Sequence, residues 1–439
     1  MSEQKKLLVI QCAALGWNQL DPANPVLADM RFAPLQTVNP AVTCTAQASF
    51  RTAAPASQHG MVANGLFHRN LRRSMFWEQA AQQVEGPRIW DAFRANGGTV
   101  GMTFWQQSLG EDVDLVLSPR PIHKHSGGMI QDCYSKPDAL YEQLESRVNG
   151  NFNLMHYWGP LASKKSSAWI TDALCELLAM PEARPDLLLT YLPHLDYDLQ
   201  RHGPDHEKAR GAREFLSECL KRLCTAAARE GYEVLIWGDY AMHKVTGPAL
   251  FPNRTLREAG YLGTRKLKGM AYPDLFAARA FAMVDHEIAH LYIRNPGDLD
   301  AVREHIAAMD GVERVIKRED APELNHPNSG ELIAFAAPGR WFAYPWWTDP
   351  KEAPDFATHV DIHNKPGFDA CELFFGRFPW QVSQDTSKVG GCHGAIGPES
   401  RTAWASTTSE LTPVPKKEGD TPTLLDLART VQNWLTPTP

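Results

Sequence analysis

The sequence predicts an α/β protein with a mostly parallel central sheet sandwiched by helices, together with a smaller α+β insert. Two short apolar runs, Leu187–Leu192 and 234–237, read as strands buried on both faces. Between them, residues 206–230 place apolar side chains at helical spacing and end at Gly231. A strand, a helix and a second strand in this order indicate a βαβ unit, so we expect the two strands to be parallel neighbours.

The other segments continue this alternation. A first strand is expected at 7–12, and a helix is expected to begin near Thr43, because Thr and Ser favour helix N-termini. Further strands are expected at 100–104 and 113–117, and helices at 135–148, 163–180, 253–260 and 423–435.

Residues 270–345 differ in character from the rest. The run 281–293 is apolar and β-like, 298–309 is an amphipathic helix, and 332–337 is another strand. We therefore predict an α/β core formed by 1–269 and 346–439, with a smaller α+β insert at 270–345.

Composition narrows the class of protein. The 439 residues are 43% hydrophobic and 22% charged, as in ordinary globular proteins, and the net charge of −7 gives no support to nucleic-acid or anionic-membrane binding. No apolar segment approaches the ~20 residues that a membrane span needs.

The 5–15 segment resembles a short signal peptide, but we favour a first strand there. Eight scattered cysteines without a CxxC pattern are typical of reduced thiols, so we expect a cytoplasmic protein. Its oligomeric state is left open.

Polar side chains follow both predicted strands. His194, Asp196, Asp198 and His202 come after the first, and Asp239 comes after the second. Ligands of open α/β sheets bind at the carboxyl ends of strands, and neighbouring strands lie ~5 Å apart. Two carboxylates at that range repel each other unless a cation or a shared proton compensates them.

Thr43 is a candidate nucleophile. A hydroxyl at a helix N-terminus lies at the positive end of the helix dipole, where phosphate groups bind well. The plain alternative is that Thr43 only caps its helix. The neighbouring Cys44 reads as a buried, inert thiol rather than a nucleophile.

Together these segments resemble the type I phosphodiesterase/nucleotide pyrophosphatase branch of the alkaline phosphatase superfamily, over roughly residues 5–400. The resemblance implies an alkaline-phosphatase-like fold, a Thr or Ser nucleophile and two zinc ions that hold the phosphoryl group. Its markers are the segments at 43–60, 196–204, 238–239, 253–260 and 391–394.

By this resemblance Thr43 occupies the nucleophile position, and Asp239 and His393 match metal ligands. Gln47 is a candidate for the oxyanion-binding role, because Ala46 occupies the slot of the family's Asn. The chain departs from the pattern where Cys12-Ala13 replaces an Asp and Tyr240 replaces a His.

Two registers remain open around the loop after Leu187–Leu192. Alignment on Gly203-Pro204 makes Asp196 the ligand and puts Gln200 in the place of a His, whereas DxxxH spacing selects Asp198 and His202. Because zinc prefers about four ligands, we expect one divalent metal, most consistent with zinc, rather than two. The predicted catalytic residues are Thr43 and Gln47. The predicted metal ligands are Asp196, His202, Asp239 and His393, with His194 as an alternative ligand. The predicted substrate-binding residues are His363, Gln200 and Tyr240, and His363 is also a candidate to replace a lost metal ligand.

We therefore predict hydrolysis of a small phosphodiester, pyrophosphate or phosphomonoester through attack of Thr43 on phosphorus. A different class of function is a catalytically silent member that binds a phosphorylated metabolite or a partner. A third reading is a zinc peptidase, because His286-Glu287-Ile288-Ala289-His290 is a literal HExxH. We disfavour it, because the surrounding residues read as a strand of the insert, away from the Thr43 crevice.

Overall fold

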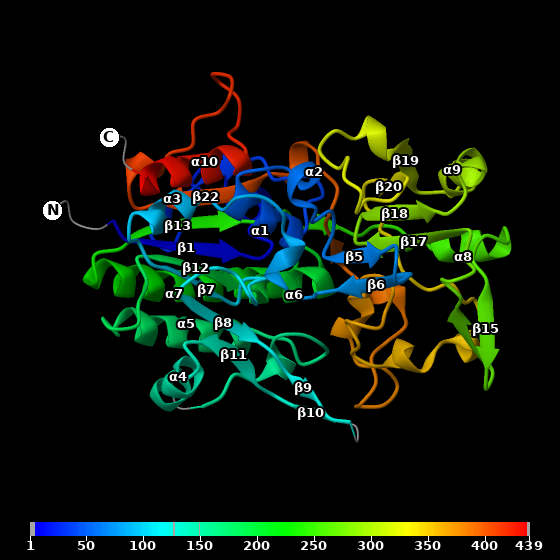
Figure 1. Cartoon of the computed structure of the whole chain (residues 1–439), viewed down its shortest axis with the longest axis horizontal. Helices are drawn as coiled ribbons and strands as arrows, with labels where there is room; N and C mark the ends of the chain where they lie inside the picture. Colours follow the sequence, from blue (N-terminus) through cyan, green and yellow to red (C-terminus); the bar gives the residue numbers. More distant parts are fainter. Residues whose placement is uncertain (1–4, 126–127, 149, 437–439) are drawn as a thin grey trace.

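The computed structural model describes residues 5–125, 128–148 and 150–436. Its central feature is an eight-stranded mixed sheet whose five middle strands β8, β7, β12, β1 and β13 run parallel (Figure 1). Strands β11, β22 and β4 are antiparallel to their neighbours at the two edges. In spatial order the strands are β11 (Cys133–Lys136), β8 (Leu115–Pro119), β7 (Val100–Thr103), β12 (Leu187–Leu192), β1 (Leu7–Cys12), β13 (Glu233–Gly238), β22 (Thr402–Ser406) and β4 (Ala33–Leu35).

Helices cover both faces of this sheet, as Figure 1 shows. Alternate residues of β1 point to opposite faces, so Leu8 and Ile10 pack into one hydrophobic core while Leu7 and Val9 pack into another. The first core is covered by α4 (Leu140–Val148), α5 (Lys165–Leu178), α6 (His194–His202) and α7 (Glu207–Arg229), and the second by α1 (Thr43–Thr52), α3 (Asp91–Ala95) and α10 (Leu424–Leu435). The predicted α/β fold class is confirmed.

The strands that the sequence predicted as direct neighbours are separated by one position. Strand β1 lies between β12 and β13 and pairs with both in parallel, so that Cys12 is level with Leu192 and with Gly238. The prediction of adjacency was therefore wrong, because nothing local in the sequence fixes where the first strand inserts. A second difference concerns 135–148, which was predicted as one helix. Strand β11 extends to Lys136 there, and α4 begins only at Leu140.

A separate four-stranded antiparallel sheet lies within the predicted insert. Its order is β17 (Ala280–Asp285), β18 (Ile288–Ile293), β20 (Leu332–Ala336) and β19 (Val312–Lys317), and α9 (Leu299–Ala307) packs against it. Its hydrophobic core also contains Leu256 of α8 (Pro252–Glu258), Trp346 and Phe368. The division of the chain into a core and an insert at 270–345 stays a prediction.

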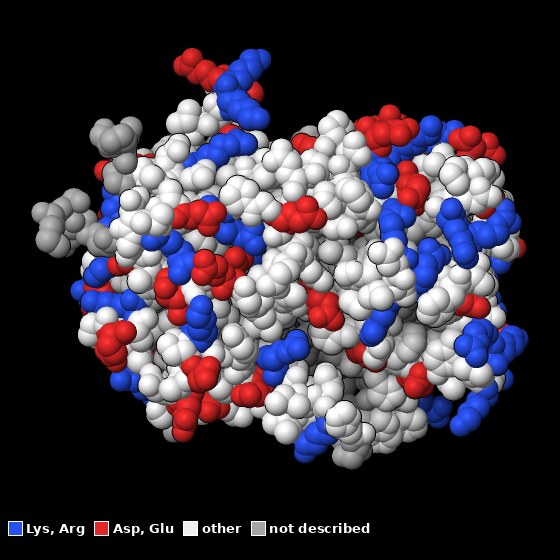
Figure 2. Space-filling model, viewed as in Figure 1, with Lys and Arg blue, Asp and Glu red and all other residues white. Residues whose placement is uncertain are grey.

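Shorter elements complete the molecule. They include α2 (Ala56–His59) and the two-stranded sheets of β5 (Gly65–His68) with β6 (Arg73–Phe76), β14 (His243–Lys244) with β21 (Gly391–Cys392), and β15 (Thr264–Leu267) with β16 (Met270–Pro273). No helix in the described ranges is long and apolar enough to cross a membrane. Basic and acidic side chains are interspersed over the face drawn in Figure 2.

Candidate functional site

Asp239 lies at the carboxyl end of the central parallel strands. Its Oδ1 accepts hydrogen bonds from the backbone N–H groups of Ala14 and Tyr240, both at 3.0 Å, and its Oδ2 accepts one from Gln11 Nε2 at 2.8 Å. Burial raises the pKa of this carboxyl to about 7, against the lowering effect of the bonds from Gln11 and Ala14. The charge of Asp239 is thus balanced by N–H donors.

Thr43 is positioned against this carboxylate. It is the first residue of α1, whose N-cap is Val42, and its Oγ1 donates to Asp239 Oδ2 at 3.3 Å. The reading of Thr43 as a plain N-cap is therefore wrong, since Val42 is the N-cap and the Thr43 hydroxyl contacts Asp239, which follows β13. Thr43 is only 3% exposed. The roles of Thr43 as nucleophile and of Asp239 as metal ligand stay predictions.

Asp196 forms a second buried carboxylate group. Its Oδ1 accepts from the Tyr240 hydroxyl at 2.9 Å, and its Oδ2 accepts from Gln200 Nε2 at 2.6 Å. Burial raises the pKa of Asp196 to about 6, while the bonds from Tyr240 and Gln200 lower it. Tyr240 and Gln200 therefore satisfy both oxygens of Asp196 by direct hydrogen bonds.

Four aromatic rings from separate segments of the chain lie in a row. Tyr240 lies flat on His393 with ring centroids 3.4 Å apart, His393 lies 3.7 Å from His286, and His286 lies 3.7 Å from Phe368. The pKa of both imidazoles is held well below the usual value by burial, so the stacked rings are neutral. His393 Nδ1 is within 2.7 Å of the Ala41 carbonyl and donates to it. We call these four residues the aromatic stack.

His286 reaches the stack from the tip of the β17–β18 hairpin. The turn is tight, and His286 has a φ of +61°, a left-handed conformation that is uncommon for a residue with a side chain. Such an outlier persists only where surrounding contacts hold it in place. Here His286 Nδ1 is 2.8 Å from Asp285 Oδ1 and the ring is sandwiched between Phe368 and His393.

The same hairpin tip is docked on the α/β core by its other two residues. Asp285 Oδ2 accepts from the backbone N–H of Asn64 at 2.7 Å, and Asn64 Oδ1 accepts from the N–H of Cys44, next to Thr43. Glu287 donates its N–H to the His393 carbonyl at 2.9 Å. Our expectation that 281–293 lies away from the Thr43 crevice was wrong, because the tip contacts residues on both sides of it.

The HExxH sequence does not form a zinc site. It spans a β-turn and a strand rather than a helix, and the ring of His290 is bonded to the backbone of Val62 and Gly330. His290 Nε2 donates to the Val62 carbonyl at 3.1 Å, and its Nδ1 accepts from the N–H of Gly330 at 3.3 Å. With both of its ring nitrogens bonded to backbone, His290 is not free to ligate.

The remaining predicted residues are dispersed. Asp198 and His202 do not contact the buried carboxylate of Asp239: Asp198 lies 3.9 Å from Arg201, and His202 is at the end of α6 and stacks on His206. Of these α6 residues, Asp196 and Gln200 are the ones that lie in the buried site. Three more predicted site residues, His194, His363 and Gln47, are hydrogen-bonded to backbone groups. His194 bonds to the Ala212 carbonyl, His363 bonds to the Phe76 carbonyl, and Gln47 accepts from the N–H of Gln106.

The donors at this centre do not suit a divalent metal. Among the described residues, no group of three or more His, Cys, Asp or Glu side chains could hold an ion. Both oxygens of Asp196 and of Asp239 already accept N–H or O–H donors. Tyr240 is already engaged, because its hydroxyl donates to Asp196 and its ring lies on His393. Zinc prefers a tetrahedral set of about four N, S or O donors, and this arrangement does not provide one.

Sequence reasoning missed Asn64, Asp285 and Phe368, and it named His286 only as part of the HExxH pattern. Asn64 lies four residues beyond the 43–60 segment that carried the resemblance, so no sequence marker included it. The other three come from the predicted insert and its return, and only the tertiary structure brings them together.

Comparisons with known proteins agree with this fold. A model of the family described as type I phosphodiesterase/nucleotide pyrophosphatase matches residues 7–369. Human ectonucleotide pyrophosphatase/phosphodiesterase 5 superposes with a TM-score of 0.61 at 16% identity, over 99% of this chain and 96% of that one. The murine protein gives 0.58 at 14% identity over the same shares.

Phosphonoacetate hydrolase from Sinorhizobium meliloti, in complex with phosphonoformate, gives a TM-score of 0.60 at 14% identity, over 99% of this chain and 96% of that one. At such low identity these structures show the fold alone. No curated protein matches the sequence. The family match covers most of the chain, which therefore belongs to the type I phosphodiesterase/nucleotide pyrophosphatase family of the alkaline phosphatase superfamily.

Proposed function

We propose that this family member recognises a small phosphorylated molecule without metal-dependent hydrolysis. One observation carries the proposal: the oxygens of Asp196 and Asp239 are hydrogen-bonded to Tyr240, Gln200, Gln11 and backbone N–H groups. Divalent metal ions are general in the family, and their carboxylate ligands are compensated by the cation. Here the compensation comes from neutral donors of the chain itself.

The two buried carboxylates of Asp196 and Asp239 are stabilised without a metal ion. Two buried carboxylates repel each other unless their charges are offset, and each of these two receives at least two hydrogen bonds. Both pKa values are raised by burial, which further reduces the charge at neutral pH. The flat contact of Tyr240 with His393 fills the space beside them.

Family membership and the helix geometry support a phosphorylated ligand. One solved murine relative is an inactive threonine-to-alanine variant in complex with AMP, and the S. meliloti hydrolase is in complex with phosphonoacetate or phosphonoformate. In this chain, Thr43 and the N-terminus of the ten-residue α1 stand at the same end of the sheet as Asp239. A helix N-terminus favours anions through its dipole and its free N–H groups.

Hydrolysis through Thr43 is the second candidate. It is favoured by the 3.3 Å contact of Thr43 Oγ1 with Asp239, which could accept the hydroxyl proton as a general base. The Oγ1–P bond would then form as the bond from phosphorus to the leaving oxygen breaks, and water would release phosphate from the threonine. This chemistry requires Thr43, which is 3% exposed, to reach a substrate.

The two candidates differ in what Thr43→Ala should do. Under the proposed function, wild-type protein does not hydrolyse bis(p-nitrophenyl) phosphate, and the variant loses only about 1 kcal/mol of unfolding free energy with the lost hydrogen bond. Thr45→Ala is a matched control, because Thr45 donates to the Met61 carbonyl at 2.9 Å and not to Asp239. Turnover by wild type that Thr43→Ala abolishes and Thr45→Ala retains would establish hydrolysis instead.

The proposal also includes a reducing, cytoplasmic compartment. All eight cysteines are free thiols, and six of them are buried. Free, scattered thiols are typical of proteins kept under reducing conditions.

A further inference from the structure

Five large apolar side chains are exposed on three neighbouring segments of the chain. Phe375, Phe378 and Trp380 lie on one loop and are 47%, 43% and 69% exposed. Leu161 and Val360 lie on the two adjoining segments and are 50% and 42% exposed. A soluble protein seldom exposes a contiguous apolar patch larger than a few hundred Å², and such patches often mark contact sites. We call these five residues the apolar patch.

Hydrogen bonds hold the three segments of the apolar patch side by side. The N–H of Val382, in the loop of the aromatic residues, donates to the Thr358 carbonyl at 2.8 Å. The Arg201 guanidinium joins the third segment to the same loop, because it donates to the Ala162 carbonyl at 2.9 Å and to the Leu373 carbonyl at 3.1 Å. The apolar patch is therefore one region of the surface, assembled from segments that are distant in the sequence.

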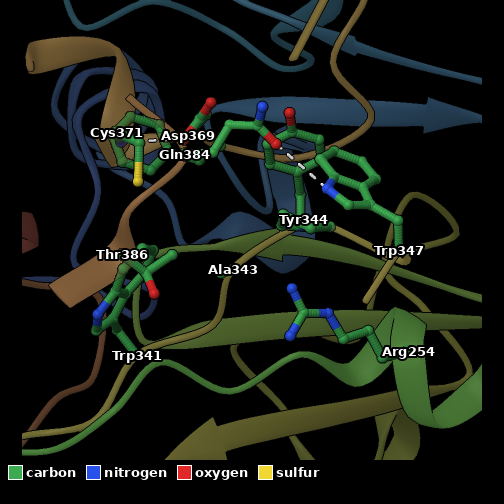
Figure 3. Close-up of a pocket in the computed structure, with 11 residues that line it drawn as sticks. Arg254, Trp341, Ala343, Tyr344, Trp347, Asp369, Cys371, Gln384 and Thr386 are labelled. Atoms are coloured by element: carbon green, nitrogen blue, oxygen red, sulfur yellow. Dashed lines mark hydrogen bonds between the residues drawn. The ribbon is translucent and has the colours of Figure 1, made fainter. Parts of the chain in front are cut away.

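The loop that carries the aromatic residues is anchored at its base. Gln384 accepts a hydrogen bond from Trp347 Nε1 at 3.3 Å, which the dashed line between these two residues in Figure 3 marks. Further along the loop, the rings of Phe378 and Trp380 stack on each other, with centroids 5.0 Å apart and planes inclined by 3°. An aromatic pair that is already ordered loses little conformational entropy when a partner covers it, which suits an anchor of an interface.

The same loop carries two opposite charges that do not pair with each other. Arg377 is exposed, and its guanidinium lies 5.7 Å from the centre of the Phe378 ring. Asp385 is exposed as well, and its Oδ1 accepts from the N–H and the hydroxyl of Ser387 at 3.1 and 2.6 Å. Within the part of the chain that the structure describes, neither residue forms an ion pair. The loop therefore presents an unpaired cation and an unpaired anion beside an apolar surface.

We propose that the apolar patch is the interface of a homodimer, in which a second copy of this chain covers it about a two-fold axis and Arg377 of each copy pairs with Asp385 of the other. In a two-fold contact both copies use the same surface, so an apolar region meets its own copy and each pair of opposite charges forms twice. The inference concerns a surface outside the candidate site, and it does not depend on the proposed function.

The exposed apolar area is of the size that a dimer needs. An aromatic side chain buries about 150–250 Å² when it is fully covered, so the exposed fractions of the three aromatic residues amount to roughly 300 Å². Leu161 and Val360 add to this area. A standard interface buries about 800 Å² on each partner, of which a little over half is apolar, so the apolar patch with a polar rim is sufficient. An anionic membrane fits less well, because it attracts cations and would repel Asp385.

Sedimentation velocity of the full chain at increasing protein concentration tests the interface. We expect wild type to be a dimer at micromolar concentration, and we expect Trp380→Ser to weaken self-association by about 30-fold or more, because a large aromatic anchor contributes most to an interface. Val414→Ser is the control, since Val414 is 77% exposed but belongs to the loop before α10, which protrudes at the top of Figure 1. The control should dimerise as wild type does, and circular dichroism of Trp380→Ser should match that of wild type.

Charge reversal tests the orientation of the two copies. Arg377→Glu should weaken the dimer about tenfold, because it places two acids opposite each other in both symmetric contacts. The double variant Arg377→Glu/Asp385→Arg should regain most of the wild-type association, since it restores both pairs with their signs exchanged. A double variant that associates no better than Arg377→Glu would overturn the pairing of these two residues.

Two results would overturn the interface itself. The first is a wild type that stays monomeric at every concentration, including a monomer that binds phospholipid vesicles through Trp380. The second is a dimer that Trp380→Ser leaves as strong as wild type, because the contact would then lie elsewhere on the surface.

Discussion

Replacing Lys365 with methionine is expected to destabilise the protein by about 3–5 kcal/mol, because it leaves the buried carboxylate of Glu372 and the largely buried one of Asp369 without their cation. Lys365 is 1% exposed, and its Nζ donates to Asp369 at 2.8 Å, to Glu372 at 2.6 Å and to the His359 carbonyl at 2.9 Å. The nearby Asp369 pulls the pKa of Lys365 above its usual value, although burial acts in the opposite direction. The lysine is therefore charged in the folded protein at all ordinary pH values.

Guanidinium-induced unfolding measures this loss directly. Lys351→Met is the matched control, since Lys351 is exposed and has no side-chain hydrogen bond or ion pair within the described ranges, and it should change the unfolding free energy by less than about 0.5 kcal/mol. A loss below 1 kcal/mol in Lys365→Met would show that the carboxylates are not held by this lysine.

Replacing Glu287 with alanine is expected to cost about 2–4 kcal/mol, because the carboxylate anchors the hairpin tip to the core. Glu287 is 4% exposed, lies 3.0 Å from His243 Nδ1, and accepts from the N–H of Ala395 at 3.0 Å. Glu319→Ala is the control, because Glu319 is exposed and makes only a 3.7 Å contact with Lys317. A cost as small as that of the control would mean that the tip is not docked as described.

The same contact predicts a pH dependence. Burial alone would lower the pKa of His243, but the hydrogen bond and charge of Glu287 outweigh burial and raise it. Because the pKa of His243 is raised in the folded protein, the stabilisation is fully present below the pKa of the unfolded state, near 6.5. It is lost as the pH rises through the pKa of the folded state. The difference in unfolding free energy between wild type and Glu287→Gln should therefore be larger at pH 6 than at pH 8.5. A difference that grows with pH would contradict this ion pair.

The sequence predicted the parts of the molecule that depend on local pattern. The runs at Leu187–Leu192 and Leu7–Cys12 are strands, and Thr43 begins a helix, since apolar periodicity and helix-start signals act within a few residues. The approach of Asp196 and Asp239, both bonded to Tyr240, also followed, because parallel strands bring their carboxyl ends to one edge.

What the sequence did not predict depends on contacts between distant segments. The insertion of β1 between β12 and β13 is a choice of sheet order, and no local signal fixes it. The aromatic stack joins Tyr240, His286, Phe368 and His393, which come from four separate segments. The HExxH pattern was a misleading signal for the same reason, because its first histidine belongs to a turn that fills the centre rather than to a helix.

Metal content tests the central claim most directly. Tag-free protein, expressed with added zinc and dialysed against metal-free buffer, should contain well below one transition metal per chain by elemental analysis, and a chelator should leave its melting temperature unchanged. This follows from the hydrogen-bonded carboxylates of Asp196 and Asp239 and from the contact of Tyr240 with His393. One or two stoichiometric metals, removed by the chelator with a fall in melting temperature, would contradict the account and restore metal-dependent hydrolysis as the function to test.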